Sequence, residues 1–355
     1  DEVKGLRRTS SSFSWRKKTY YNSFVSHNLS YLISPFSSKK AHCNSLKHNV
    51  QMNPHDKTNA HTKRTGGLEV SKVLVRDLNK KRDFEGIPEN CVFTDKVEDI
   101  LSDENLDVVV ELVGGADGVA KELTLGALSK GKHVVSANKA LIAAHGEDIV
   151  NVMEENPSAK FGFEASVCGG IPIIHALQRD FIPDRVKRLS GVFNGTTNFI
   201  LSSMELQGRG YDEVLKEAQD LGFAEDDPTN DIAGYDARYK LVILTYLITG
   251  IWLAPEQITL EGIGHLEPAD FAYASRMDRR IKLIGYFKRE DQNLQAFVLP
   301  LMVPRGSAVA KIGGSTNIVS IEGKFSEEIS MIGKGAGSLP TASALVADLE
   351  KISKG

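Results

Sequence analysis

The sequence has 355 residues, 41% of them hydrophobic and 25% charged, which is typical of a soluble globular protein with enough chain for two domains. The net charge of −3 argues against a general nucleic-acid-binding protein, and no apolar run is long enough to cross a bilayer. The three cysteines are scattered without the spacing of metal ligands, which indicates a reducing compartment and no disulfide framework.

The first 65 residues differ in composition from the rest. They contain 12 Lys and Arg, five His and three acidic residues, a local charge of about +9, so the remainder carries about −12. The segment is rich in Ser, Asn and Lys and has no sustained hydrophobic periodicity. We expect a disordered or weakly ordered basic leader over residues 1–67, whose composition fits an organelle transit peptide or a misassembled reading frame.

From residue 68 onward, strand-like and helix-like stretches alternate. Strands are predicted in residues 68–78, 91–95, 106–115 and 132–138, and helices in residues 96–103, 118–131 and 139–156. The run LDVVVELVGG is continuously apolar and closed by two glycines, which is typical of a parallel strand buried on both faces. This alternation predicts βαβ units and a parallel sheet.

The pattern changes in the second half of the chain. Residues 159–177 and 186–206 each read as a strand, a turn and a helix, and residues 211–250 as a helix, an acidic loop and a long apolar helix. Several strands follow in residues 281–331, and a glycine-containing loop opens a final helix in residues 333–353. These elements predict a second domain of the α+β class.

Lys139 directly follows the strand-like run that ends in Ser136, Ala137 and Asn138, and it opens a helical pattern. The carboxyl ends of parallel strands are where open α/β sheets bind their ligands. An isolated lysine at such a position is ordinarily a solvated loop residue, so its interpretation depends on the rest of the chain.

The acidic stretch GFAEDDPTNDIAGYDARYK, residues 222–240, is more informative. It places Glu225, Asp226, Asp227 and Asp231 in a loop before a helix that contains Asp236 and Lys240. The loop acids could simply favour the positive end of the helix, and the i,i+4 pair could lie on the surface. The residues that follow are almost wholly apolar, however, so the helix is predicted to be buried, and a charged pair leading into it is more often functional. Carboxylates beside a lysine can hold a substrate ammonium while the lysine meets a developing oxyanion.

Three turns rich in small residues are less specific. In residues 193–201 helix capping by Thr196, Thr197 or Asn198 explains the small hydroxyl and amide residues. Residues 164–172 combine Glu164 with glycines, which suits either a tight turn or a hard monovalent cation held by Glu164 and backbone carbonyls. The glycines of residues 333–337 suit either a phosphate site or close packing.

Taken together, these stretches resemble the homoserine dehydrogenase family of NAD(P)-dependent oxidoreductases. The matching motifs are VRDLNKKR, DVVVELVGG, GKHVVSANKALIA, FEASVCGGIPII, NGTTNFIL, EAQDLGFAEDDPTNDIAGYDARYKL and GKGAGSLPTASALVADL. They occur in the family's order over residues 68–355, and the run from 218 to 241 is highly specific. The resemblance implies interconversion of L-homoserine and L-aspartate 4-semialdehyde in threonine, methionine and isoleucine biosynthesis.

The resemblance also implies roles for individual residues. Lys240 matches the family's general acid/base, with Lys139 assisting and Asp236 as its paired acid. Glu225 matches the acid that binds the substrate, and Asp231 lies in the same loop.

Cofactor and metal positions follow in the same way. The cofactor-lining positions that the resemblance implies are Arg76, Gly114, Gly115, Ser136, Lys139 and Gly337. An arginine after the second strand suits a 2′-phosphate, so NADP is favoured over NAD. The family's sodium site matches Glu164 with the carbonyls of Val167, Gly169 and Ile171.

The expected fold is an α/β protein with an incomplete Rossmann-like parallel sheet and an α+β substrate and dimerisation domain. We expect a partial dinucleotide-binding domain over residues 68–138, the substrate domain over 139–332, and a helix in 333–355 that returns to the first domain. The family's first strand and its Gly-rich phosphate turn find no match before residue 68. The alternative function is therefore a catalytically impaired, dimerising remnant of this family.

The expected partners are a small-molecule substrate and a second copy of the chain, with no nucleic acid and no membrane. The expected location is the cytoplasm, or an organelle of the plastid type if the basic leader is a transit peptide.

Overall fold

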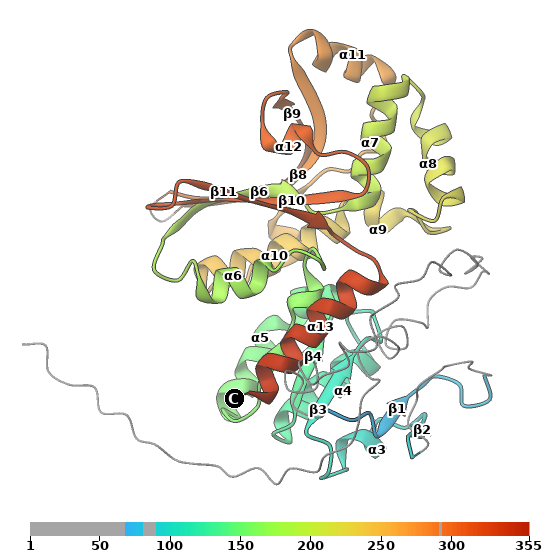
Figure 1. Ribbon diagram of the computed structural model, residues 1–355, viewed down its shortest axis with the longest axis vertical. Helices are drawn as coiled ribbons and strands as arrows, with labels where there is room; N and C mark the ends of the chain where they lie inside the picture. The colour runs from blue at the N-terminus through green and yellow to red at the C-terminus, as the bar shows by residue number, and fades with distance from the viewer. Residues whose placement is uncertain (1–67, 81–89, 291–292, 355) are drawn as a thin grey trace, which may run out of the picture.

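The computed structural model describes residues 68–80, 90–290 and 293–354 (Figure 1). The predicted leader, residues 1–67, lies outside this part of the chain, and so does the segment in which a Gly-rich phosphate turn would have to stand. No helix in the described ranges is long and apolar enough to cross a membrane.

The first half of the described chain is an α/β unit. Its elements are β1 (Lys72–Leu74), β2 (Val92–Thr94), α3 (Glu98–Leu101), β3 (Val108–Glu111), α4 (Val119–Ser129), β4 (His133–Ser136), α5 (Lys139–Glu155) and β5 (Phe161–Gly162). Every strand pairing here is parallel, in two sheets with the orders β1-β2 and β3-β4-β5. The prediction of βαβ units and parallel pairing is confirmed. In a doubly wound sheet, the first strand of the fold lies between two groups of parallel strands of this kind.

The parallel sheet continues past residue 138, the boundary expected from the sequence. β5 pairs with β4 through Phe161 and Gly162, and α5 packs on α4. The helix that Lys139 opens therefore lies against the nucleotide half of the molecule rather than apart from it.

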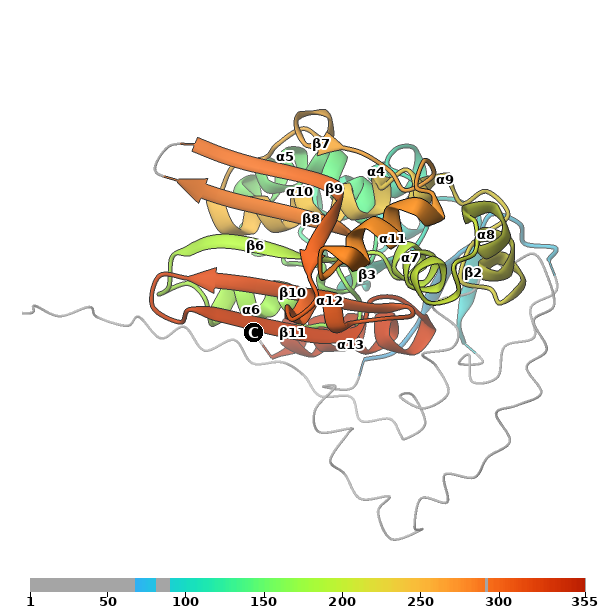
Figure 2. The same ribbon diagram turned by 90° about the horizontal axis from the view of Figure 1, so that it is seen from above.

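The second half contains a mixed sheet and most of the helices. Its elements are η3 (Glu164–Ser166), α6 (Ile173–Arg179), β6 (Val186–Val192), α7 (Gly195–Gln207), α8 (Tyr211–Asp220), α9 (Thr229–Ile232), α10 (Tyr235–Thr249), η4 (Pro255–Gln257), β7 (Thr259–Leu260), α11 (Pro268–Arg276), β8 (Arg279–Glu290), β9 (Asn293–Pro304), α12 (Ala308–Lys311), β10 (Thr316–Gly323), β11 (Glu328–Lys334) and α13 (Ser338–Ser353). The strand order is β11-β10-β6-β8-β9-β7, antiparallel except for the β7–β9 pair. Figure 2 shows these strands side by side from above.

α10 is the central helix of the molecule. It lies between the six-stranded sheet and the nucleotide half, and it packs on β8, β9 and α5 (Figure 1). Its middle residues Leu241, Val242, Ile243 and Leu244 are fully buried, which explains the almost wholly apolar sequence there. Gly234 precedes the helix with φ 84°, and a side chain at that position would meet Leu260. The glycine fixes the start of the helix, and so the first two turns that carry Asp236 and Lys240.

α13 returns to the nucleotide half, as Figure 1 shows. It packs against β4, β5 and η3, where Leu345 and Ala344 form a small core with Val135 and Ala165. The first residues of the predicted glycine loop, Gly333 and Lys334, belong to the end of β11, so the loop before α13 is shorter than expected.

Candidate active site

Two lysines from different halves of the molecule share one buried carboxylate. Lys240 Nζ lies 2.7 Å from Asp236 Oδ2, and Lys139 Nζ lies 3.1 Å from Asp236 Oδ1. Asp236 and Lys240 stand one turn apart in α10, whereas Lys139 is the first residue of α5. The structure therefore brings together the three residues that the sequence singled out from separate motifs.

The carboxylate is charged in spite of its burial. Burial alone would raise the pKa of Asp236, but the charges of Lys240 and Lys139 and the hydrogen bonds to it hold that pKa well below its usual range. Burial alone would lower the pKa of Lys240, and Asp236 raises it above the ordinary lysine value. The pair is therefore an ammonium and a carboxylate at neutral pH.

A backbone carbonyl is a second hydrogen-bond acceptor of Lys240. Its Nζ donates to Phe193 O at 2.7 Å, at the end of the β6 strand region. An ammonium has three protons, and the described residues accept two of them at this lysine, through Phe193 and Asp236. The third proton has no acceptor among the described residues.

Asn194, which the sequence analysis treated only as part of a capping turn, links the acids of the site. Its Nδ2 donates to Asp236 Oδ2 at 2.8 Å and to Asp231 Oδ1 at 2.6 Å, while its Oδ1 accepts from Thr197 N and caps α7. Burial raises the pKa of Asp231, and the charge of Asp236 adds to that rise. The helix is capped as expected, but by Asn194 rather than by Thr196, Thr197 or Asn198. The same Asn194 side chain also orders the two carboxylates.

Glu225 lies apart from this cluster. Its side chain is exposed in the loop between α8 and α9, and within the described ranges it makes no hydrogen bond or ion pair. Only its backbone carbonyl is used, by Gln219 Nε2.

The carboxyl ends of β3 and β4 form a second polar group. The Ser136 hydroxyl donates to the fully buried Glu111 at 2.6 Å, and Asn138 Nδ2 donates to Gly115 O at 2.7 Å. Gly114 and Gly115 are exposed and have φ of 79° and 77°, which L side chains rarely adopt. Backbone rather than side chain thus faces outward here, where the sequence placed a cofactor.

The remaining predicted cofactor residues lie on other elements. Arg76 is exposed two residues after β1, and Gly337 precedes α13 with φ 117°. Lys139 belongs to both groups. Its ammonium is paired with Asp236, and it is the first residue of α5, the helix that Asn138 caps at the end of β4.

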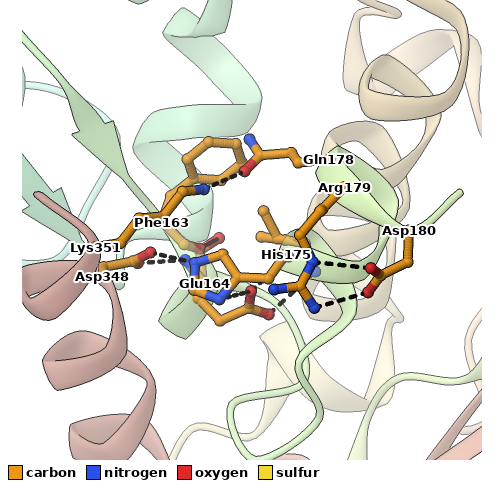
Figure 3. A network of polar contacts seen from close by, with 10 residues as sticks. Phe163, Glu164, His175, Gln178, Arg179, Asp180, Asp348 and Lys351 are labelled. Carbon is orange, nitrogen blue, oxygen red and sulfur yellow. Dashed lines mark hydrogen bonds and ion pairs between the residues drawn. The ribbon is translucent and has the colours of Figure 1, made fainter. Parts of the chain in front are cut away.

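Glu164, the carboxylate among the predicted sodium ligands, has several partners of its own. Glu164 is buried, and its two oxygens accept from Ile174 N at 3.0 Å and His175 N at 2.6 Å at the start of α6. His175 lies between Glu164 and Asp348, with Nε2 2.7 Å from Asp348 Oδ1 (Figure 3). Burial raises the pKa of both Glu164 and Asp348.

Of the other predicted ligand positions, Val167 and Ile171 are buried, and Gly169 lies against Thr341 of α13. The sequence analysis did not single out His175 or Asp348. They are far apart in the chain, and no local pattern pairs them.

Comparison with known proteins identifies the family. The family model for homoserine dehydrogenase matches residues 172–349, and the model for the homoserine dehydrogenase NAD-binding domain matches residues 51–161. The homoserine dehydrogenase of Bacillus subtilis (strain 168) is 40% identical over 287 residues, 81% of this chain and 65% of that protein. That of Pseudomonas aeruginosa is 42% identical over 283 residues, 80% of this chain and 64% of that protein. The chain belongs to the homoserine dehydrogenase family.

Solved homoserine dehydrogenases show the same fold. The structure from Thiobacillus denitrificans matches with a TM-score of 0.78 and 41% identity, covering 82% of this chain and 67% of that one. A hyperthermophilic archaeal homoserine dehydrogenase in complex with NADPH matches with a TM-score of 0.64 and 28% identity, covering 73% and 75%. The nucleotide half is therefore a Rossmann-like NAD-binding domain. The chain spans slightly less than two thirds of the length of the Bacillus and Pseudomonas homoserine dehydrogenases.

Proposed function

We propose that this chain catalyses the NADP-dependent interconversion of L-homoserine and L-aspartate 4-semialdehyde, a step of threonine, methionine and isoleucine biosynthesis. The observation that carries the proposal is the buried ion pair of Lys240 and Asp236, which Lys139 meets from the nucleotide half. A charged pair at a junction between a dinucleotide domain and a second domain is placed where a cofactor and a substrate can meet.

Lys240 acts as the general acid of the reduction. Its remaining proton is donated to the oxygen of the aldehyde as that oxygen becomes an alkoxide. Asp236 keeps the lysine charged until that moment, and Lys139 adds a second positive charge that stabilises the developing oxyanion. In the oxidation of homoserine, Lys240 takes the proton back. When bound, the nicotinamide supplies the hydride chemistry.

The amino-acid end of the substrate needs an anionic partner. Asp231, held by Asn194, and the exposed Glu225 lie in the acidic loop before α10, and we assign both to the substrate ammonium. Because Asp231 is linked through Asn194 to Asp236 on the helix that carries Lys240, binding at this end sets the distance to the reacting carbon.

NADP is the expected cofactor. Arg76 stands at the end of β1, where a guanidinium can bind a 2′-phosphate, and the positive-φ glycines Gly114 and Gly115 let backbone approach the dinucleotide. Gly337 and Lys139 complete the expected lining. The buried Ser136 acts through Glu111, to which its hydroxyl donates.

A sodium ion suits the donor type of the predicted residues. A hard monovalent cation prefers oxygen ligands, and the buried carboxylate of Glu164 with the carbonyls of Val167, Gly169 and Ile171 offers them. Glu164 also accepts hydrogen bonds from α6, so the carbonyls would supply most of the ligands. We assign the ion a structural place and no step of the reaction.

We further propose a homodimer in the cytoplasm. The family resemblance implies that the α+β substrate domain forms a subunit contact, and this supports the proposal of a dimer. The Bacillus and Pseudomonas homoserine dehydrogenases are bacterial and lend no support to an organelle. Sedimentation equilibrium of the purified chain tests the dimer.

The central experiment follows NADPH oxidation by the purified chain with L-aspartate 4-semialdehyde. We expect turnover, and a loss of about 100-fold or more in kcat for Lys240→Met. Lys216→Met, in the exposed surface of α8, serves as the matched control and should retain activity. A folded wild-type chain without turnover would instead support the remnant, an alternative that the family match does not favour.

A further inference from the structure

Asn317 lies behind the active-site lysine on β10 and is fully buried. Its Nδ2 donates to Phe193 O at 2.9 Å, and Lys240 Nζ donates to the same oxygen at 2.7 Å. A carbonyl oxygen has two lone pairs, so one carbonyl serves both donors. Asn317 is thus one backbone atom away from the proton donor of the proposed reaction.

The shared carbonyl belongs to a peptide that the site depends on. The next residue, Asn194, caps α7 and donates to Asp236 and Asp231. A rotation of the Phe193–Asn194 peptide would therefore move the carbonyl that binds Lys240 and, with it, the Asn194 amide that binds both carboxylates. Asn317 is the side chain that binds this peptide from the β10 side.

The Asn317 side chain is itself held tightly. A Cβ at Gly335 would lie 1.9 Å from Asn317 Nδ2, so the backbone after β11 closes over the amide. The amide nitrogen also lies 3.5 Å from Cys168 Sγ, while Oδ1 has no hydrogen-bond partner within the described part of the chain. A buried amide oxygen without a partner is unfavourable for folding, so the contribution of this side chain lies in what its nitrogen donates.

We propose that Asn317 is a positioning residue for Lys240, which fixes the Phe193 carbonyl that orients the lysine ammonium. The inference rests on the proposed function, because it assigns a purpose to the exact place of Lys240. Without the amide, the Phe193 carbonyl accepts from Lys240 alone and is held less firmly in its direction. Lys240 then has no fixed direction for its remaining proton, although substrate and cofactor contacts are unchanged.

The first test compares Asn317→Leu with the wild type. Leucine has a similar branched shape and cannot donate, so we expect kcat to fall by about 10- to 100-fold while KM for L-aspartate 4-semialdehyde changes by less than about threefold. Ser320→Ala is the matched control, because Ser320 is buried on the same strand and its hydroxyl is hydrogen-bonded to that of Ser330 on β11. An equal loss in both variants, or a change in KM alone, would overturn the proposal.

A second variant reaches the same amide from the other side. Gly335→Ala should displace the Asn317 side chain and lower kcat, and the double variant with Asn317→Leu should lose little more than the worse single variant. Additive losses would show that Gly335 acts by another route and would remove this support for the amide.

A readout without turnover separates this inference from the proposed function. In protein labelled with ¹³C at lysine Cε, the Lys240 signal is assigned by its loss in Lys240→Arg and followed against pH. We expect its shift and titration to change in Asn317→Leu and to stay as in the wild type in Ser320→Ala. An unchanged Lys240 signal overturns the inference even if the wild type is active, whereas an inactive wild type with a changed signal overturns only the proposed function. If Asn317→Leu does not fold, Asn317→Ala gives the comparison with the donor removed and no charge introduced.

Discussion

Lys139 and Asp236 form an ion pair across the boundary between the two halves of the molecule, with Nζ and Oδ1 3.1 Å apart. Lys139 is partly exposed, and Asp236 is buried on α10, where its second oxygen is bound to Lys240. The reacting centre is therefore complete only when α5 and α10 are packed as they are here. Each of the charges can be tested separately.

Asp236→Asn should reduce both activity and stability. The change leaves Lys240 buried without its counter-ion, and breaking a buried pair in this way costs roughly 3–5 kcal/mol of unfolding free energy at neutral pH. Because the folded-state pKa of Asp236 is lowered, its contribution is present above the ordinary aspartate value of about 3.9 and is lost as the pH falls below it.

Urea unfolding of both proteins at several pH values measures this linkage. The difference between wild type and Asp236→Asn should narrow as the pH drops below about 4. Asp220→Asn, at an exposed position on α8, is the control and should show a difference near zero throughout. A gap that widens on acidification would contradict the assignment of a lowered pKa.

Lys282→Met should remove a pH dependence at the alkaline end. Burial lowers the pKa of Lys282 to about 8, although its amine bonds to Asn198 Oδ1, Ser202 Oγ and Ile312 O. Between that value and about 10.4 the unfolded chain binds more protons, so wild-type stability should rise with pH relative to the variant by roughly 1–3 kcal/mol. Chemical unfolding at neutral and alkaline pH measures the rise, and a flat difference would refute it.

Arg76→Ala should change the choice of cofactor. If the guanidinium binds the 2′-phosphate, its loss raises KM for NADPH by about tenfold or more and leaves KM for NADH much less affected. Steady-state kinetics with both cofactors measures the ratio of the two KM values. Lys130→Met, at the C-terminal end of α4, is the control. Equal increases for the two cofactors would place Arg76 elsewhere in the site.

Gly146→Ala should weaken the packing of α5 on the segment after α10. An added Cβ would lie 2.1 Å from the ring of Trp252, which is stacked on Tyr246. Overpacking of this kind costs roughly 1–3 kcal/mol, measured by thermal or urea unfolding. Gly306→Ala, where a Cβ meets nothing within 4 Å, should change the unfolding free energy by only about 0.5 kcal/mol or less. Similar losses in the two variants would show that the clash with Trp252 is relieved by a small shift.

The sequence allowed prediction of those parts of the site that depend on local patterns. Asp236 and Lys240 pair within one helix at i,i+4, and Lys139 follows a strand whose apolar run is plain in the sequence. The parallel strands and the buried α10 follow from hydrophobic periodicity in the same way.

What the sequence could not reveal depends on contacts between distant residues. Asn194 meets Asp236 at a separation of 42 residues, Asn317 meets Phe193 at 124, and His175 meets Asp348 at 173. No periodicity links such positions, since only the packing of distant elements in the folded chain brings them together. Nearness in sequence also misleads, because Glu225 is exposed although its neighbour Asp231 is held within the cluster.

The return of α13 to the nucleotide half has a consequence for synthesis of the protein. Glu164 N bonds to Asp348 across 184 residues, and α13 covers a face of β4 and β5 made long before it. At about 5–20 residues per second, that apolar face stays uncovered on the ribosome for roughly 10–40 s. During this interval Val135 and Ala165 lack the side chains that bury them, so a nascent chain stalled before α13 should be a preferred client of chaperones that bind exposed hydrophobic surface.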